Sequence, residues 1–537
     1  MINVKGGHSS QNEETIGGFR GSYNKLIAWI ISRIIAEKNI NRALDIAEFY
    51  GGLRWENFDG IYQDNDLEGI VELKVRQSQN LHLPDFTGNE ARTILIASAL
   101  YDSGGHARVV LNWMKAFKEY GQHRLLITRL ATIGYRRYLE EHRILYHLCA
   151  SGGIELINEI LVYCADAQRI VLHTHPDDII TAIAARILGK SGKTIIFFNH
   201  ADHVFSFGLS AATVVCEISR YGIELNKRTH RVKDYSYLGI PIDCFSRCAD
   251  SSSPAGKEQN KTVFSGGPSY KYAPGESCFS DLIDNVLEQR HDVSFLLAGP
   301  TGKESWWIEV KERWGNRIQF LGVLSHSHYL ERLAKADVYV DSFPISGGTA
   351  FPEALLSGRL VTALNNPIQG YSPADALRLG DVQQLSEEVI RLLNHDPISM
   401  SRVEQVRERA MAIHSIISFH ERVEHIYAGV YDKNAHSEAS VDTHWSERRW
   451  ENGSIVSLPN LAIWYRLPLR FCIAFTFTFN RLFGFSQHKN RWYLLRRMFV
   501  KPLPGLLRSY ARNIYNKLQR HLSEDAATLS TSIRSEK

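Results

Sequence analysis

The chain has 537 residues, 44% of them hydrophobic and 22% charged. This length exceeds one hydrophobic core, so two or three folded domains are expected, and the composition excludes a wholly disordered chain. The seven cysteines form no CxxC pair, which argues against a cysteine zinc site and a disulfide framework and favours a reducing compartment. No run reaches the roughly 20 apolar residues of a membrane span, and the polar residues 1–14 lack the form of a secretory signal.

The formal net charge of +4 conceals an uneven distribution. Residues 453–537 hold 14 Lys and Arg against 3 Asp and Glu, a balance of +11, whereas the other 452 residues are net −7. The C-terminal segment therefore differs in kind from the body of the chain.

Residues 1–88 are predicted to form a helical N-terminal region, with disorder over 1–20 and helices over 25–39 and 42–50. An apolar cluster on the first helix favours a hairpin packed on the main body over a membrane contact. The cluster consists of Leu26, Ile27, Trp29, Ile30 and Ile34. Asp64-Asn65-Asp66 has the form of a metal-binding DxD, but its polar surroundings favour a solvated turn.

A first α/β domain is predicted over 89–247, because apolar strand patterns alternate there with amphipathic helix patterns. The strands are expected at 93–100, 124–128, 170–173 and 194–198, and the helices at 107–119, 154–163 and 178–188. Such alternation is typical of a doubly wound parallel sheet, whose ligands bind beyond the carboxyl ends of the strands.

Glycines and polar side chains gather at those predicted strand ends. They are Gly104, Gly105, His106, His173, His175, Asn199, His200, Asp202 and His203. His106 could act as a general base near neutral pH or be a surface imidazole. His173 and His175 could bind a metal, but no third ligand follows at a convincing spacing, so we expect hydrogen bonding to a sugar or phosphate instead. A structural role stays open for each histidine.

A polar stretch over 248–260 reads as a linker, and a second α/β domain is predicted over 261–431. Its strands are expected at 261–265, 293–298, 318–321 and 338–340, and its helices at 279–289, 304–314, 329–335, 351–357, 385–394 and 413–431. Neither domain carries GxGxxG or GxxxxGK[ST], which argues against a dinucleotide dehydrogenase and a P-loop ATPase.

Two glycine turns of this second domain suit a phosphate-bearing ligand. One contains Ser346, Gly347, Gly348 and Thr349 and leads into a helix with Glu353 in its first turns. The other contains Gly266 and leads to Lys271, which could neutralise a diphosphate leaving group. The alternatives are an ordinary strand-to-helix turn and a surface lysine.

Over residues 90–431 these pieces together resemble the GT-B glycosyltransferases, in two branches. The run 103–109, SGGHARV, is similar to the glycine loop of the retaining GT-B enzymes, and HTH at 173–175 and PEAL at 352–355 are similar to their later motifs. Ile345 stands where the first Glu of their last motif is found. YKYAP at 270–274 and the run 337–349 are similar to segments of O-GlcNAc transferase-like enzymes.

The resemblance implies two Rossmann-like domains facing a cleft, with the acceptor on the first domain and a nucleotide sugar, UDP-linked by expectation, on the second. It implies catalytic roles for His106, His175 and Lys271, with His106 as base if the enzyme inverts. The donor would contact Gly104, Gly105, Gly266, Lys271, Ser346, Gly347, Gly348, Thr349 and Glu353. Candidates on the acceptor side are His173, Asn199, His200, Asp202 and His203. The resemblance implies no metal and no cofactor. A protein acceptor and a non-catalytic scaffold are the alternatives.

The tail over 432–537 is basic and aromatic, and residues 455–523 contain no Asp or Glu. Leucines and aromatic residues interleaved with Arg and Lys over 455–522 predict an amphipathic segment on an anionic membrane. Nucleic-acid binding has a similar signature, but the apolar content favours the membrane; a helical cap with a solvated basic face is the plainer alternative. We therefore expect a cytoplasmic enzyme, peripheral on the inner face of the cytoplasmic membrane, that builds a cell-surface glycan or acts on a lipid-linked acceptor.

Overall fold

The chain forms two compact units in its computed structural model. The structure describes residues 9–87, 92–102, 104–118, 123–243, 260–366, 369–445, 447, 456–459 and 461–483. One unit, residues 61–64 and 80–446, contains two parallel β-sheets, and the other, residues 1–60, 65–79 and 447–537, draws its described helices from both ends of the chain. The predicted linker, 248–260, falls outside the described residues except for its last.

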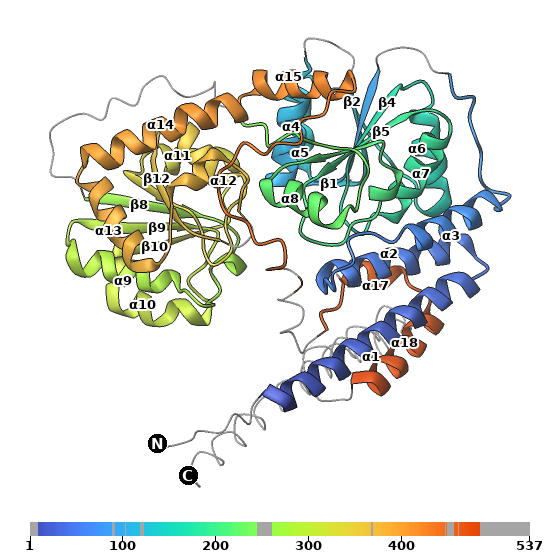
Figure 1. The fold of residues 1–537 in the computed structure, drawn as a ribbon, viewed down its shortest axis with the longest axis horizontal. Helices are drawn as coiled ribbons and strands as arrows, with labels where there is room; N and C mark the ends of the chain where they lie inside the picture. The colour runs from blue at the N-terminus through green and yellow to red at the C-terminus, as the bar shows by residue number, and fades with distance from the viewer. Residues whose placement is uncertain are drawn as a thin grey trace, which may run out of the picture. The chain divides into compact units, whose positions relative to one another are not determined.

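The first sheet has seven parallel strands in the order β3-β2-β1-β4-β5-β6-β7. The strands are β1 (Thr93–Leu100), β2 (His123–Ala131), β3 (Tyr146–Leu148), β4 (Arg169–His173), β5 (Thr194–Asn199), β6 (Val214–Glu217) and β7 (Tyr235–Tyr237). The helices are α4 (Gly105–Ala116), α5 (Ile133–Glu141), α6 (Gly153–Tyr163), α7 (Ile179–Lys190) and α8 (Arg220–Thr229). Every residue of β1 is buried, as helices on both faces require (Figure 1).

The second sheet repeats this winding with six parallel strands in the order β10-β9-β8-β11-β12-β13. The strands are β8 (Lys261–Gly266), β9 (Val293–Ala298), β10 (Ile318–Gly322), β11 (Val338–Val340), β12 (Leu360–Leu364) and β13 (Arg378–Leu379). The helices are α9 (Phe279–Gln289), α10 (Ile308–Trp314), α11 (His326–Ala334), α12 (Ala350–Leu356) and α13 (Val382–Leu393).

The strand orders confirm the predicted fold, two Rossmann-like doubly wound domains as in GT-B proteins. In each sheet the winding reverses beside the first strand, between β1 and β4 and between β8 and β11. Ligands of open parallel sheets bind at such switch points, at the carboxyl ends of the strands. The glycine turns after β1, β8 and β11 all lie at these two points.

After the second domain the chain returns to the first domain. Two helices, α14 (Pro397–His414) and α15 (Ile416–Tyr427), follow the second domain. On α15, Phe419 packs its ring on Trp113 of α4, with centroids 5.1 Å apart, and the Tyr427 hydroxyl lies 2.9 Å from His123 Nε2. Helix α15 thus covers the core of the first domain (Figure 1).

The helical unit contains α1 (Ser9–Ala36), α2 (Ile40–Glu56), α3 (Asn65–Arg76), α17 (Leu461–Arg466) and α18 (Leu469–Phe483). The expectation of disorder over residues 1–20 is wrong from Ser9 onward, because α1 begins there. The expectation of a turn at Asp64-Asn65-Asp66 is also wrong, since Asn65 begins α3. The start of that helix was missed because its first residues are polar and give no apolar spacing.

The described part of the tail contributes core side chains to this helical unit. Phe475 of α18 is fully buried and packs on Phe49 of α2, with ring centroids 5.2 Å apart. Trp464 of α17 also packs on Phe49, at 4.8 Å. These rings of the predicted membrane segment therefore lie inside the protein. None of the described helices combines the length and hydropathy that a membrane crossing requires, and the part of the predicted amphipathic segment from 484 to 522 lies outside the described residues.

Candidate functional site

A cavity of about 790 Å³ lies between the two domains. Its wall on the first domain includes Gly104 and Arg108 from the start of α4 and Tyr138 of α5. Its wall on the second domain includes His326 at the start of α11 and Glu353 of α12. The cavity thus lies where the two winding reversals predict a ligand.

Glu353 is the centre of the charge arrangement in this cavity. Its carboxylate forms an ion pair with the Arg108 guanidinium, and Glu353 Oε1 lies 2.9 Å from His326 Nε2. Burial by itself would raise the pKa of Glu353, but Arg108 and the hydrogen bond from His326 outweigh burial and hold the pKa below its ordinary value. Glu353 is therefore a fixed negative charge in the cavity at neutral pH.

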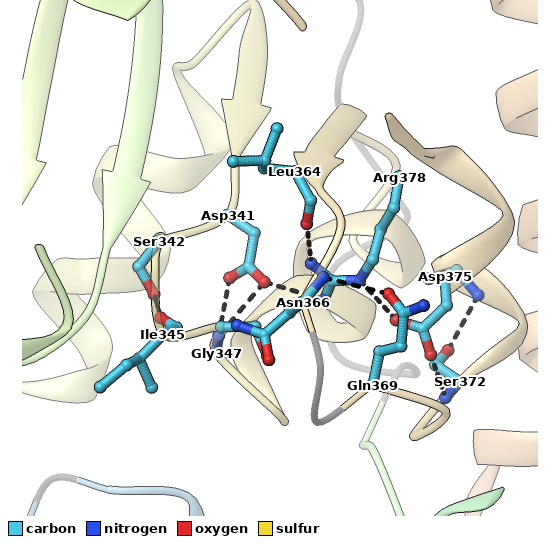
Figure 2. A network of polar contacts seen from close by, with 12 residues as sticks. Asp341, Ser342, Ile345, Gly347, Leu364, Asn366, Gln369, Ser372, Asp375 and Arg378 are labelled. Atoms are coloured by element: carbon cyan, nitrogen blue, oxygen red, sulfur yellow. Dashed lines mark hydrogen bonds and ion pairs between the residues drawn. The ribbon is translucent and has the colours of Figure 1, made fainter. Parts of the chain in front are cut away.

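The glycine turn after β11 is organised by a buried carboxylate, Asp341 (Figure 2). The Gly347 N–H donates to Asp341 Oδ1 at 3.0 Å, and Arg378 Nη2 donates to Asp341 Oδ2 at 3.0 Å. Arg378 also donates to Asp375 Oδ1 at 2.6 Å. Burial raises the pKa of Asp341, although Arg378 and Lys271 oppose the rise. The buried Asp341 and Arg378 thus fix the turn that carries Gly347 and Gly348.

Lys271 reaches the same turn from β8. Its Nζ donates to the Ser346 carbonyl oxygen at 2.6 Å, and burial lowers its pKa below the ordinary value. Gly266 has a packing role, because a Cβ at this position would lie 2.4 Å from the ring of Tyr329. Lys271 and the glycine turn are therefore brought together as predicted, beside the cavity wall and not on it.

The glycine loop after β1 approaches the turn of the second domain closely. A Cβ on Gly105 would lie 2.8 Å from Thr349 Oγ1. Gly104 has φ +115°, a conformation that residues other than glycine rarely adopt. The structure therefore brings Gly104, Gly105 and Thr349 together; Ser103 lies outside the described residues.

Four predicted histidines form a cluster behind this loop. The ring centroid of His106 lies 4.3 Å from that of His173, 4.5 Å from that of His200 and 5.1 Å from that of His175. Burial lowers the pKa of His175 to about 4 and that of His200 to about 3. Burial and the neighbouring imidazoles hold the pKa values of His106 and His173 well below the ordinary range. All four rings are therefore neutral at pH 7.

The remaining predicted residues belong to a buried network at the ends of β5 and β6. Asn199 Nδ2 donates to Glu217 Oε2 at 3.0 Å, and Glu217 forms an ion pair with Arg231 at 2.9 Å. Asp202 accepts a hydrogen bond from Ser219, and His203 Nδ1 lies 3.2 Å from Asp202 Oδ1. Within the described part of the chain, the cavity wall includes no member of the predicted acceptor set.

Several residues that shape the cavity or its neighbouring turn were not predicted from the sequence. His326 follows β10. It could have been predicted in the same way as His106, as a polar residue shortly after the end of a strand. The wall formed by α5 includes Tyr135, Arg137, Tyr138 and His142, and this helix was missed because its apolar spacing is sparse. Arg378, which holds the glycine turn through Asp341, has no local signal for that contact because the two residues are 37 apart in the chain; its other partner, Asp375, is three residues away.

Comparisons with solved structures return similar folds at low identity. The chain is similar to HepE of Anabaena in complex with UDP and glucose, at 16% identity and a TM-score of 0.46, over 63% of this chain and 100% of that one. It is similar to a glycosyltransferase of Rickettsia africae at 14% and 0.48, over 64% and 99% of the two chains. It is similar to an O-GlcNAc transferase mutant of Thermobaculum terrenum at 13% and 0.48, over 73% and 81%. No protein-family model and no curated protein matches the sequence. Because these TM-scores are below 0.5, the fold assignment rests on the strand orders.

Proposed function

We propose that the protein is a glycosyltransferase that moves a sugar from a nucleotide-sugar donor to an acceptor bound in the same cavity. The observation that carries the proposal is the position of Glu353. This carboxylate lies in a cavity at the switch points of two parallel sheets, where parallel sheets bind nucleotides. A carboxylate there can accept hydrogen bonds from the ribose hydroxyls of the donor.

The leaving diphosphate is proposed to meet Lys271 and the turn at Gly347 and Gly348. A Cβ on Gly348 would have no heavy atom of the described residues within 4 Å, so this turn leaves room for a ligand. The Lys271 ammonium lies directly against the turn, on the Ser346 carbonyl. A cation and backbone amides at this point would stabilise the charge that develops as the glycosidic bond breaks. We propose that these protein groups, and no metal ion, perform this task.

The acceptor is proposed to lie against α4 and α5. The cavity wall there combines the rings of Tyr101, Tyr135 and Tyr138 with the charged groups of Asp102 and Arg137, a mixture that suits a sugar with apolar faces and polar edges. For the residue near the reacting sugar we favour His175, which is neutral and partly exposed, over His106, whose ring nitrogens are both buried.

A membrane-associated acceptor, such as a lipid-linked glycan of a cell-envelope pathway, is the proposed context. Leu469, Ile473 and Phe477 recur every fourth residue on α18 and are 40%, 37% and 68% exposed. They form an apolar stripe on a helix that also carries Arg470 and Arg481. Such a stripe with basic neighbours favours contact with an anionic membrane.

Donor binding and turnover test the enzymatic proposal. UDP and UDP-sugars are titrated by calorimetry, and donor hydrolysis and transfer are assayed for Glu353→Gln and Lys271→Met. We expect each variant to lose about 10²-fold or more in kcat/KM, whereas the exposed controls Glu331→Gln and Lys335→Met keep full activity. Unchanged kinetics in the first pair would refute the site. A wild-type chain that no nucleotide sugar stabilises in a thermal-shift screen would favour the non-catalytic scaffold.

The membrane context has a separate test on the intact chain. Ile473→Asp with Phe477→Asp should abolish flotation with anionic vesicles, whereas Ile398→Asp, at a site that is 80% exposed on α14, should not. Equal flotation of the two proteins would exclude the α18 stripe as the membrane contact. Deleting the tail is the weaker experiment, because α17 and α18 supply core side chains to the helical unit.

A further inference from the structure

Three adjacent strands of the first sheet each lead to a histidine at or after the carboxyl end of the strand. His173 is the last residue of β4, His200 directly follows β5, and His106 lies in the first turn of α4 after β1. The order β1-β4-β5 makes these strands neighbours, and parallel strands bring their carboxyl ends to one edge. One nitrogen from each of the three rings lies within 4.8 Å of one from each other ring.

Five of the six ring nitrogens of these three histidines are buried without a hydrogen-bond partner among the described residues. Among the described residues, neither nitrogen of His106 or His173 has a hydrogen-bond partner, and the same holds for Nδ1 of His200. His173 is 0% exposed. A buried polar atom without a partner destabilises the fold, so three such rings at one point are most simply explained as a ligand site.

We propose that His106, His173 and His200 together bind one divalent transition-metal ion of the zinc type. Tetrahedral coordination at 2.0–2.1 Å would place the three nitrogens about 3.3 Å apart, a separation that modest side-chain rotation reaches from the observed cluster. The three ligands contain no carboxylate, and imidazole ligands favour Zn²⁺, Co²⁺, Ni²⁺ or Cu²⁺ over Mg²⁺ or Ca²⁺.

The ion links the ends of three strands and anchors the start of α4. Gly104 and Arg108, on either side of His106 along the chain, line the cavity, so the metal fixes the loop that forms this part of the wall. The sequence predicted that His173 would act together with its neighbour His175. In the structure, His173 instead lies with His106 and His200, which follow two other strands. The site does not depend on the proposed transfer reaction, and its occupancy can be measured without a substrate.

Metal binding by the full-length chain tests this site. The purified protein is treated with a chelator, dialysed and titrated with Co²⁺ alone, while visible absorption reports tetrahedral coordination and elemental analysis reports stoichiometry. We expect one Co²⁺ per chain, displaced by Zn²⁺, and a Tm raised by about 2–4 °C or more at saturation. His173→Gln and His200→Gln should each weaken binding at least about a hundredfold.

The matched control is His203→Gln, which removes a histidine from the same segment but outside the cluster. This variant should keep the wild-type cobalt spectrum and affinity. Circular dichroism of each variant distinguishes loss of the site from loss of the fold, and the half-buried His200 provides the variant that disturbs packing least. A folded wild-type chain without saturable Co²⁺ binding would overturn the proposal, and so would full binding in folded His200→Gln.

Discussion

Arg108 of α4 and Glu353 of α12 form an ion pair between the two domains. Their side chains are only 22% and 13% exposed, and His326 provides a second partner for the carboxylate. The carboxylate proposed to hold the donor ribose thus already contacts a guanidinium of the opposite domain. A donor entering the cavity must share or replace this contact.

Replacing Arg108 by Gln should destabilise the protein by about 1–3 kcal/mol at pH 7, because Glu353 would lose its charged partner. The folded-state pKa of Glu353 lies below its ordinary value of 4.5, so this stabilisation is present above about pH 4.5 and is lost as the pH falls through the folded pKa. Urea unfolding at pH 7 and pH 4 measures the difference between the two proteins. A difference that does not shrink at pH 4 would argue against the ion pair as its source.

Replacing Gly105 by Ala should lower Tm, because the added Cβ would meet Thr349 Oγ1 at 2.8 Å. The second change Thr349→Ala removes that oxygen and should restore most of the loss. Gly104→Ala is the comparison: it is strained by its φ of +115°, but its Cβ would meet no heavy atom within 4 Å in the part of the chain that the structure describes, so Thr349→Ala should not rescue it. Differential scanning calorimetry of the single and double variants gives the coupling; equal rescue of both glycine variants would contradict the contact.

Replacing Arg378 by Met should cost about 3–5 kcal/mol, because Asp341 and Asp375 would remain in a buried site without their cation. Arg378 also donates to the Leu364 carbonyl oxygen at 2.9 Å, so the variant leaves a backbone acceptor unpaired as well. Guanidinium unfolding measures the loss. Arg402→Met, at an exposed residue of α14, is the control, and a similar small effect in both variants would show that the network contributes little.

Strand ends were the most informative feature of the sequence, because apolar runs identify parallel strands and fold topology determines where their carboxyl ends meet. His106, Lys271 and Glu353 were found in this way. Arg378 was not, because its contact with Asp341 joins residues 37 apart in the chain and has no local periodicity. The wall formed by α5 was not, because the apolar spacing of that helix is sparse. The assignment of Asn199 to a ligand site shows a second limit: polarity at a strand end does not distinguish a ligand contact from the buried bond that this amide makes to Glu217.

Phe475→Ala and Phe477→Ala should behave differently although they are two residues apart. Phe475 is 0% exposed and Phe477 is 68% exposed, so the first change removes a core ring at about 3–5 kcal/mol and the second costs at most about 0.5 kcal/mol. Thermal unfolding followed by helical circular dichroism measures both losses. Equal losses would contradict the packing of α18 on α2.

Acid should destabilise the protein partly through His414. Its imidazole is fully buried, with its two nitrogens 2.8 Å from the Ile240 carbonyl oxygen and from Ser372 Oγ, and burial lowers its pKa to about 4 from an ordinary 6.5. As the pH falls, His414 is therefore protonated in the unfolded chain at a higher pH than in the folded chain. The free energy of unfolding falls from about pH 6.5 towards pH 4 by up to about 1.4 kcal/mol per pH unit. His414→Gln should flatten the slope of unfolding free energy against pH; an identical slope would exclude this residue as a source.

The return of α15 onto α4 means that the two domains cannot be obtained separately by cutting the chain between them. A fragment ending near residue 243 would lack Phe419, which covers Trp113 in the intact protein, and Tyr427, which contacts His123. Such a fragment would expose a large indole surface and tend to associate with itself, whereas co-expression with residues 260–445 should restore a soluble pair. The order of synthesis follows as well: the first domain acquires its last core helix only after the whole of the second has left the ribosome.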